Sequence, residues 1–122
     1  MNSIIVAILL IFLAPGPPYI ESDRPYSDLI DIDFHPPCEP NGIVTGYQVI
    51  CKERNSAKNC GDRSFGRNQR RIRLDKLRRL TGYIVTLHAK TRLGKGKPAT
   101  IEFYTKGDPS KNPLDNLILF YD

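Results

Sequence analysis

The chain has 122 residues, a formal net charge of +5, ten prolines and nine glycines. This length has room for one domain with short extensions. So many prolines and glycines exclude a mainly helical fold, because both residues weaken helices. Beyond the N-terminal segment no stretch shows helical periodicity, which predicts an all-β domain.

The N-terminal segment is strongly apolar. Residues 4–14 form an uninterrupted apolar run of eleven residues, shorter than the roughly 20 residues that a membrane-spanning helix needs. The run has the length of a signal-peptide core, so residues 1–16 are predicted to be a signal peptide, and no transmembrane segment is expected. No basic residue precedes the run, and Pro15 stands where a peptidase prefers a small residue. The alternatives are a truncated gene product or the edge of a longer segment.

Short strand signals separated by turn residues occupy the rest of the chain. They fall at residues 19–22, 29–34, 44–52, 60–65, 70–75, 83–90 and 98–105. The 83–90 segment alternates most regularly, and Leu77 stands six residues before Tyr83. This spacing predicts a tyrosine corner, in which a strand-initial tyrosine hydroxyl reaches back to the preceding loop. Six or seven short strands without a helix are typical of a β-sandwich.

Four pieces of the sequence together resemble a fibronectin type III domain over about residues 17–107. They are Phe34-His-Pro-Pro37, Gly46-Tyr-Gln-Val-Ile-Cys51, Leu77 with the Tyr83 strand, and Gly94-Lys-Gly-Lys-Pro98 with Thr105. The first piece departs from the family, which usually has a tryptophan where this chain has Phe34. Phenylalanine still fills that position with an apolar ring.

The resemblance implies a seven-stranded, immunoglobulin-like β-sandwich of two antiparallel sheets. Strands A, B and E would form one sheet, and strands C, C′, F and G the other. It also implies a function in binding, with no catalytic residues, cofactor or metal, in an extracellular array of a cell-surface receptor, adhesion or matrix protein. Residues 37–43, leading into Tyr47, look especially like modules of receptor-type tyrosine phosphatase ectodomains. Residues 108–122 would be a linker and the start of a second module, or else an edge strand or end of this domain.

The three cysteines fit an exported protein, and their spacing does not fit a metal site. If residues 45–52 form strand C, Cys38 and Cys51 lie at opposite ends of it, about 20 Å apart at roughly 3.3 Å per residue. A disulfide needs Cα atoms within about 7 Å. A C–C′ hairpin returns Cys60 to Cys51, so we predict a Cys51–Cys60 disulfide, with Cys38 as a free thiol or an intermolecular partner. The alternative is that Cys51 and Cys60 are buried, unpaired thiols.

Positive charge is concentrated in one part of the chain. Fifteen of the eighteen Lys and Arg residues lie between Lys52 and Lys97, where only three acidic residues oppose them. Such a surface favours a polyanion, and for an exported domain a heparin-like sulfated glycan is favoured over nucleic acid. Part of the charge is expected to be structural, because Asp31 and Asp33 should lie across from Arg71 and Arg73 on neighbouring strands.

The remaining basic residues give the predicted partner-binding site. It comprises Lys90, Arg92, Lys95 and Lys97, with Arg63, Arg67, Arg70, Arg78 and Arg79 in flanking loops. His35 and His88 are expected at the surface without a catalytic or metal role. Two functions stay open: a non-catalytic adhesion or receptor module with a protein partner, and a small secreted basic protein that binds sulfated glycans or an acidic protein.

Overall fold

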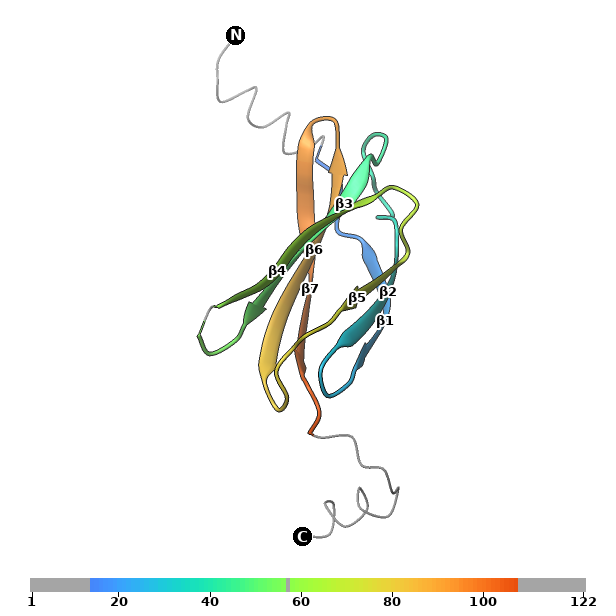
Figure 1. Ribbon diagram of the computed structural model, residues 1–122. Helices are drawn as coiled ribbons and strands as arrows, with labels where there is room; N and C mark the ends of the chain where they lie inside the picture. The colour runs from blue at the N-terminus through green and yellow to red at the C-terminus, as the bar shows by residue number, and fades with distance from the viewer. Residues whose placement is uncertain (1–13, 57, 108–122) are drawn as a thin grey trace.

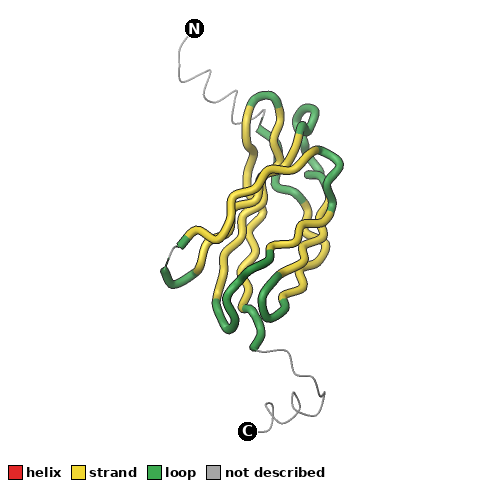
Figure 2. Tube along the Cα trace, in the orientation of Figure 1, coloured by secondary structure: helices red, strands yellow, loops and turns green. Residues whose placement is uncertain are grey.

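The computed structural model describes residues 14–56 and 58–107, which form a sandwich of two antiparallel sheets (Figure 1). The strands are β1 (Tyr19–Pro25), β2 (Ile30–His35), β3 (Gly46–Glu53), β4 (Asn59–Gly66), β5 (Arg71–Leu74), β6 (Gly82–Thr91) and β7 (Gly94–Tyr104). One sheet has the order β1-β2-β5 and the other β4-β3-β6-β7. The predicted fold and its division of strands between the sheets are confirmed. Figure 2 shows that the loops gather at the two ends of the sandwich.

β6, the strand in which apolar and polar residues alternate most regularly, lies inside the larger sheet. β6 pairs with β3 on one side and β7 on the other. Its inward side chains, from Tyr83 to Ala89, are all buried. Burial of apolar side chains on alternate residues of such a strand is a main source of stability in a sandwich.

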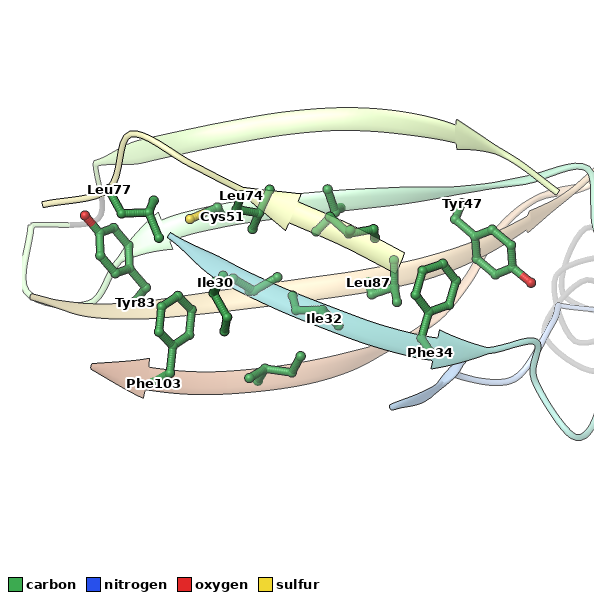
Figure 3. Close-up of a cluster of buried hydrophobic side chains, with 14 of the residues drawn as sticks. Ile30, Ile32, Phe34, Tyr47, Cys51, Leu74, Leu77, Tyr83, Leu87 and Phe103 are labelled. Carbon is green, nitrogen blue, oxygen red and sulfur yellow. The ribbon is translucent and has the colours of Figure 1, made fainter. Parts of the chain in front are cut away.

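Aromatic pairs close the core at both ends (Figure 3). Phe34 meets Tyr47 edge to face, with ring centroids 4.9 Å apart. At the opposite end Tyr83 stacks on Phe103 at 5.5 Å. Phe34 is 1% exposed, so it fills the core position in which the family usually has a tryptophan.

The predicted tyrosine corner is present beside Leu77. The Tyr83 hydroxyl accepts a hydrogen bond of 2.7 Å from the backbone N–H of Arg78. Thr105 secures the same turn, because its hydroxyl donates to the Arg78 carbonyl at 2.5 Å and accepts from the Thr81 N–H at 3.0 Å. The loop before β6 is thereby fixed to the end of β7.

Residues 14–16, which the sequence assigns to the signal peptide, contact the sandwich. Pro15 is buried, and its carbonyl accepts a 3.1 Å hydrogen bond from the Lys97 N–H. The Gly16 N–H donates to the Glu39 carbonyl at 2.9 Å. The packed domain therefore includes residues before the expected boundary at 17. Residues 1–13 and 108–122 lie outside the described residues, so the signal peptide and the second module stay predictions.

The last strand begins earlier than the sequence indicated. β7 starts at Gly94 instead of residue 98, because Gly94 adopts a φ of 126° that allows a tight turn after β6. The backbone near Gly96 is then held against Pro15. Lys95 and Lys97 consequently lie on a strand, whereas the sequence placed them in a turn.

Candidate binding site

A surface hollow lies between the β2–β3 loop and the β6–β7 turn, at the end of the sandwich where the described chain begins (Figure 1). Its volume is about 460 Å³. Its walls are mainly apolar and come from Asn41, Gly42, Ile43, Thr45, Thr91, Arg92 and Leu93. The hollow is open to solvent and large enough to receive side chains of a partner.

Hydrogen bonds fix the β2–β3 loop on both sides of the hollow. Asn41 has a left-handed φ of 52°, and its side-chain amide donates to the Ala14 carbonyl at 3.0 Å. The Thr45 N–H and hydroxyl both donate to the Lys90 carbonyl, at 2.8 and 3.2 Å. Ile43 lies between these two anchors and is 77% exposed. Ile43 is therefore exposed on a loop whose backbone is held in place on both sides.

Leu93 completes the apolar part of the hollow from the other side. It stands at the β6–β7 turn and is 53% exposed. Neither Ile43 nor Leu93 is among the partner-binding residues predicted from the sequence. An available signal was that each is an apolar residue beside a turn glycine, Gly42 and Gly94, where no strand face would bury it.

The predicted partner-binding residues do not all lie together. Arg92 lines the hollow. Lys90 and Lys95 stand directly opposite each other on β6 and β7, and the Lys90 ammonium donates to the Ser64 hydroxyl at 3.3 Å. Lys97 is exposed further along β7. Within residues 14–56 and 58–107, no ion pair involves any of these four residues, so their charges are not neutralised by a carboxylate there.

The structure contains a disulfide between Cys51 on β3 and Cys60 on β4, with Cα atoms 5.1 Å apart. Cys51 is fully buried in the core, and Cys60 packs against it. Cys38 is exposed in the β2–β3 loop and makes no disulfide among the described residues. The disulfide therefore fastens the edge strand β4 to the sheet.

The expected charge ladder crosses the outer face of the smaller sheet. Asp31 pairs with Arg73 and Asp33 with Arg71, in the register predicted from the sequence. The closest distances are 2.7 Å from Arg73 Nε to Asp31 and 2.6 Å from Arg71 Nε to Asp33. Arg24 on β1 adds a 3.0 Å ion pair to Asp33.

These contacts change the acidity of both carboxyl groups. The hydrogen bond from Arg71 lowers the pKa of Asp33 from 3.8 to about 2, although desolvation acts in the opposite direction. The hydrogen bond from Arg73 likewise lowers the pKa of Asp31. Both aspartates are therefore ionised at neutral pH, and each is paired with an arginine of β5.

Each histidine contacts a neighbouring strand of its own sheet. His88 Nδ1 lies 2.8 Å from the Gly96 carbonyl, and His35 Nε2 lies 3.3 Å from a Glu21 carboxylate oxygen. Among the described residues no group of three or more His, Cys, Asp or Glu side chains could hold a metal ion. In the same part of the chain no helix is long and apolar enough to cross a membrane.

Residues 14–105 match the fibronectin type III domain family. Three relatives come from larger proteins. Human protein sidekick-1 is 34% identical over 110 residues (86% of this chain), and rat neuronal cell adhesion molecule is 31% identical over 99 residues (79% of this chain). Human phosphatidylinositol phosphatase PTPRQ is 29% identical over 85 residues, or 69% of this chain. The chain spans only 5%, 8% and 4% of these proteins, respectively.

Solved structures share the fold. A human FNIII domain, described as the fourth of its protein, has a TM-score of 0.66 and 21% identity, and the match covers 80% of this chain and 86% of that one. A redesigned β-sandwich protein also has a TM-score of 0.66, with 17% identity over 80% of this chain and 96% of that chain. The relatives thus include a phosphatase as well as a cell adhesion molecule, in keeping with the resemblance noted for residues 37–43.

Proposed function

The chain belongs to the fibronectin type III family, and from that premise we propose that it is a non-catalytic extracellular binding module, one unit of a larger cell-surface receptor or adhesion protein. Two observations support the proposal. Relatives that match most of this chain are far longer proteins, and one is named as a cell adhesion molecule. The Cys51–Cys60 disulfide suits the oxidising environment outside the cell.

The module would bind a protein partner through the hollow beside Ile43 and Leu93. The observation that carries this choice is the pair of exposed apolar side chains, held on constrained loops and flanked by unpaired basic residues. Protein interfaces commonly have an apolar centre and a polar rim. Here Arg92 is the basic residue in the lining, and Lys90 and Lys95 lie opposite each other on the adjoining strands β6 and β7. The expected partner therefore offers an apolar side chain with acidic neighbours.

The test compares two variants of the chain fused to an antibody Fc fragment, with binding to live cells measured by flow cytometry. Ile43→Asp places a charge in the hollow and should reduce binding at least about tenfold. Leu80→Asp is the matched control, because Leu80 is also 77% exposed but lies outside the residues that line the hollow. Equal binding by both variants and the unmodified chain would contradict this location.

Enzyme treatment of the cells identifies the class of partner. Protease treatment should abolish binding, and heparinase should leave it intact. The opposite pattern would support the second candidate function, binding of a heparin-like sulfated glycan. That candidate rests on the net charge of +5 and on arginines that have no carboxylate partner among the described residues.

A further inference from the structure

We propose that the side of the sandwich between β4 and β5 is a binding surface for a sulfated glycan, separate from the hollow. This proposal rests on the second candidate function, binding of a heparin-like glycan, and names the residues that would bind it. The surface consists of Arg63 on β4, Arg67 and Arg70 in the β4–β5 loop, and Arg71 and Arg73 on β5. We call these five residues the arginine seam. In Figure 1, β5 is the edge strand of its sheet on the side nearest β4.

Three members of the arginine seam have no carboxylate partner. No ion pair in the described ranges involves Arg63, Arg67 or Arg70. The sequence from Arg63 to Leu74 contains no Asp or Glu. The acidic residue before this stretch, Asp62, accepts a 2.8 Å hydrogen bond from Gln48. No carboxylate of the described residues therefore neutralises these three guanidinium groups by direct contact.

Backbone carbonyls hold two of these guanidinium groups in place. Arg63 Nη1 donates to the Arg73 carbonyl at 3.1 Å, a contact that joins the two sheets. Arg70 Nη1 donates to the carbonyls of Arg67 and Gln69, at 2.9 and 2.7 Å. A neutral carbonyl fixes a guanidinium without cancelling its charge. Fixing the group in advance lowers the entropy cost of binding.

Most donors of these guanidinium groups remain available. Arginine carries five N–H donors in a rigid fork, and the carbonyl contacts of Arg63 and Arg70 use only Nη1. Both side chains belong to exposed residues. The remaining planar pairs of donors match the spacing of two oxygens on one sulfate group.

Arg71 and Arg73 extend the surface along β5. Each is paired with an aspartate, yet their side chains are 64% and 62% exposed. Alternate residues of a strand lie roughly 6.6 Å apart, so Arg71 and Arg73 present two cations in a row along β5. A linear polyanion fits such a row better than a compact acidic group does.

The seam lacks the apolar anchors that a protein interface uses. The large exposed apolar side chains of the described residues lie elsewhere, at Tyr19, Tyr26, Ile43, Leu80, Leu93 and Tyr104. Phe65, whose ring centre lies 5.2 Å from the Arg63 guanidinium, is partly buried. A surface of guanidinium groups without apolar anchors favours a sulfated glycan over a protein.

The test measures binding of a size-defined heparin oligosaccharide to the full chain by surface plasmon resonance. R63Q/R67Q/R70Q should bind at least about tenfold more weakly than the unmodified chain, because it loses three charge-assisted contacts. K90Q/K95Q/K97Q is the matched control, since it removes the same charge from β6 and β7, outside the seam. It should change the affinity by less than about threefold. R63K/R67K/R70K keeps the charge but loses the planar fork, and should fall between the two.

Three outcomes would overturn the proposal once circular dichroism shows that the variants are folded. The two glutamine variants could weaken binding equally, which would indicate general charge attraction. Desulfated heparin could bind as well as heparin. Vesicles containing phosphatidylserine could bind more tightly than heparin, which would identify an anionic membrane instead. Ile43→Asp should leave heparin binding unchanged. The experiment can therefore contradict glycan binding at the seam without contradicting protein binding at the hollow, and the reverse.

Discussion

Two fully buried tyrosines, Tyr47 and Tyr83, stand at opposite ends of the core and differ in what their hydroxyl groups contact (Figure 3). Tyr83 accepts a hydrogen bond from the Arg78 N–H. The Tyr47 hydroxyl makes no well-formed hydrogen bond to any described residue. Burial raises the pKa of Tyr47, and the nearby Arg70 guanidinium offsets part of that rise. The same residue type therefore contributes differently to stability at the two positions.

Tyr83→Phe should lower the free energy of unfolding by about 1–2 kcal/mol, because it leaves the Arg78 N–H without its acceptor. Urea denaturation followed by circular dichroism measures the change. Tyr104→Phe is the control. Tyr104 is 60% exposed, so loss of its contact with Arg54 should cost less than about 0.5 kcal/mol. Equal effects of the two substitutions would show that the corner hydrogen bond adds nothing.

Tyr47→Phe should leave the free energy of unfolding unchanged or raise it by up to about 1 kcal/mol, because it removes a buried hydroxyl that lacks a partner. The same denaturation experiment applies. A loss of more than about 1 kcal/mol would mean that the hydroxyl has a partner in solution.

At the scale of elements, the ladder across β1, β2 and β5 ties the smaller sheet together through ion pairs. Asp31 faces outward as its sequence position predicts, yet it is only 3% exposed. Arg73 contacts it through two nitrogens, with distances of 2.7 and 2.8 Å. An ionised carboxylate in this position depends on its arginine, because a buried charge without a partner is strongly unfavourable.

The ladder predicts a loss of stability in acid. The folded pKa of Asp33 is about 2, below its ordinary 3.8. Its contribution is therefore complete above 3.8 and is lost as the pH falls towards 2. Thermal unfolding temperatures measured between pH 5 and pH 2 should decline, and Asp33→Asn should flatten the decline. An unchanged slope in this variant would show that other carboxyl groups control acid unfolding.

The positions of the strands could be predicted from the sequence more accurately than the residues that form the surface hollow, for a physical reason. In segments such as 83–90, apolar and polar residues alternate, and the apolar ones are those that the opposing sheet buries. This alternation can be seen within a few consecutive residues. The hollow depends on contacts between residues far apart in the chain, such as Asn41 with Ala14 and Thr45 with Lys90. The first part of β7 likewise contacts a distant residue, because the Lys97 N–H donates to the Pro15 carbonyl. No local pattern records these contacts.

At the scale of the whole molecule, the first described residues are part of the domain. Pro15 packs against the beginning of β7, where a Cβ atom at Gly96 would lie 2.1 Å from the Pro15 carbonyl oxygen. The predicted signal-peptide boundary after residue 16 would remove this contact. A cleavage that preserves the contact would have to lie before Pro15.

Gly96→Ala should therefore destabilise the protein by about 1–3 kcal/mol, because the backbone of Pro15 must move away. Gly61→Ala is the matched control, since a Cβ atom there meets nothing within 4 Å. Both effects can be measured by urea denaturation. A stable Gly96→Ala variant would show that residues 14–16 detach at little cost.

The Cys51–Cys60 disulfide has a consequence for mechanical load. The described chain begins at one end of the sandwich and leaves at the other (Figure 1), so tension along a chain of modules would pull this domain end to end. After unfolding, the bond would keep the residues between its cysteines looped. The sequence separation is 9 and the Cα atoms are 5.1 Å apart, so at roughly 3.3–3.6 Å per residue the stretched chain is shorter by about 25 Å. Single-molecule pulling with and without a reducing agent should reveal this difference in contour length, and equal lengths would show that the bond does not limit extension.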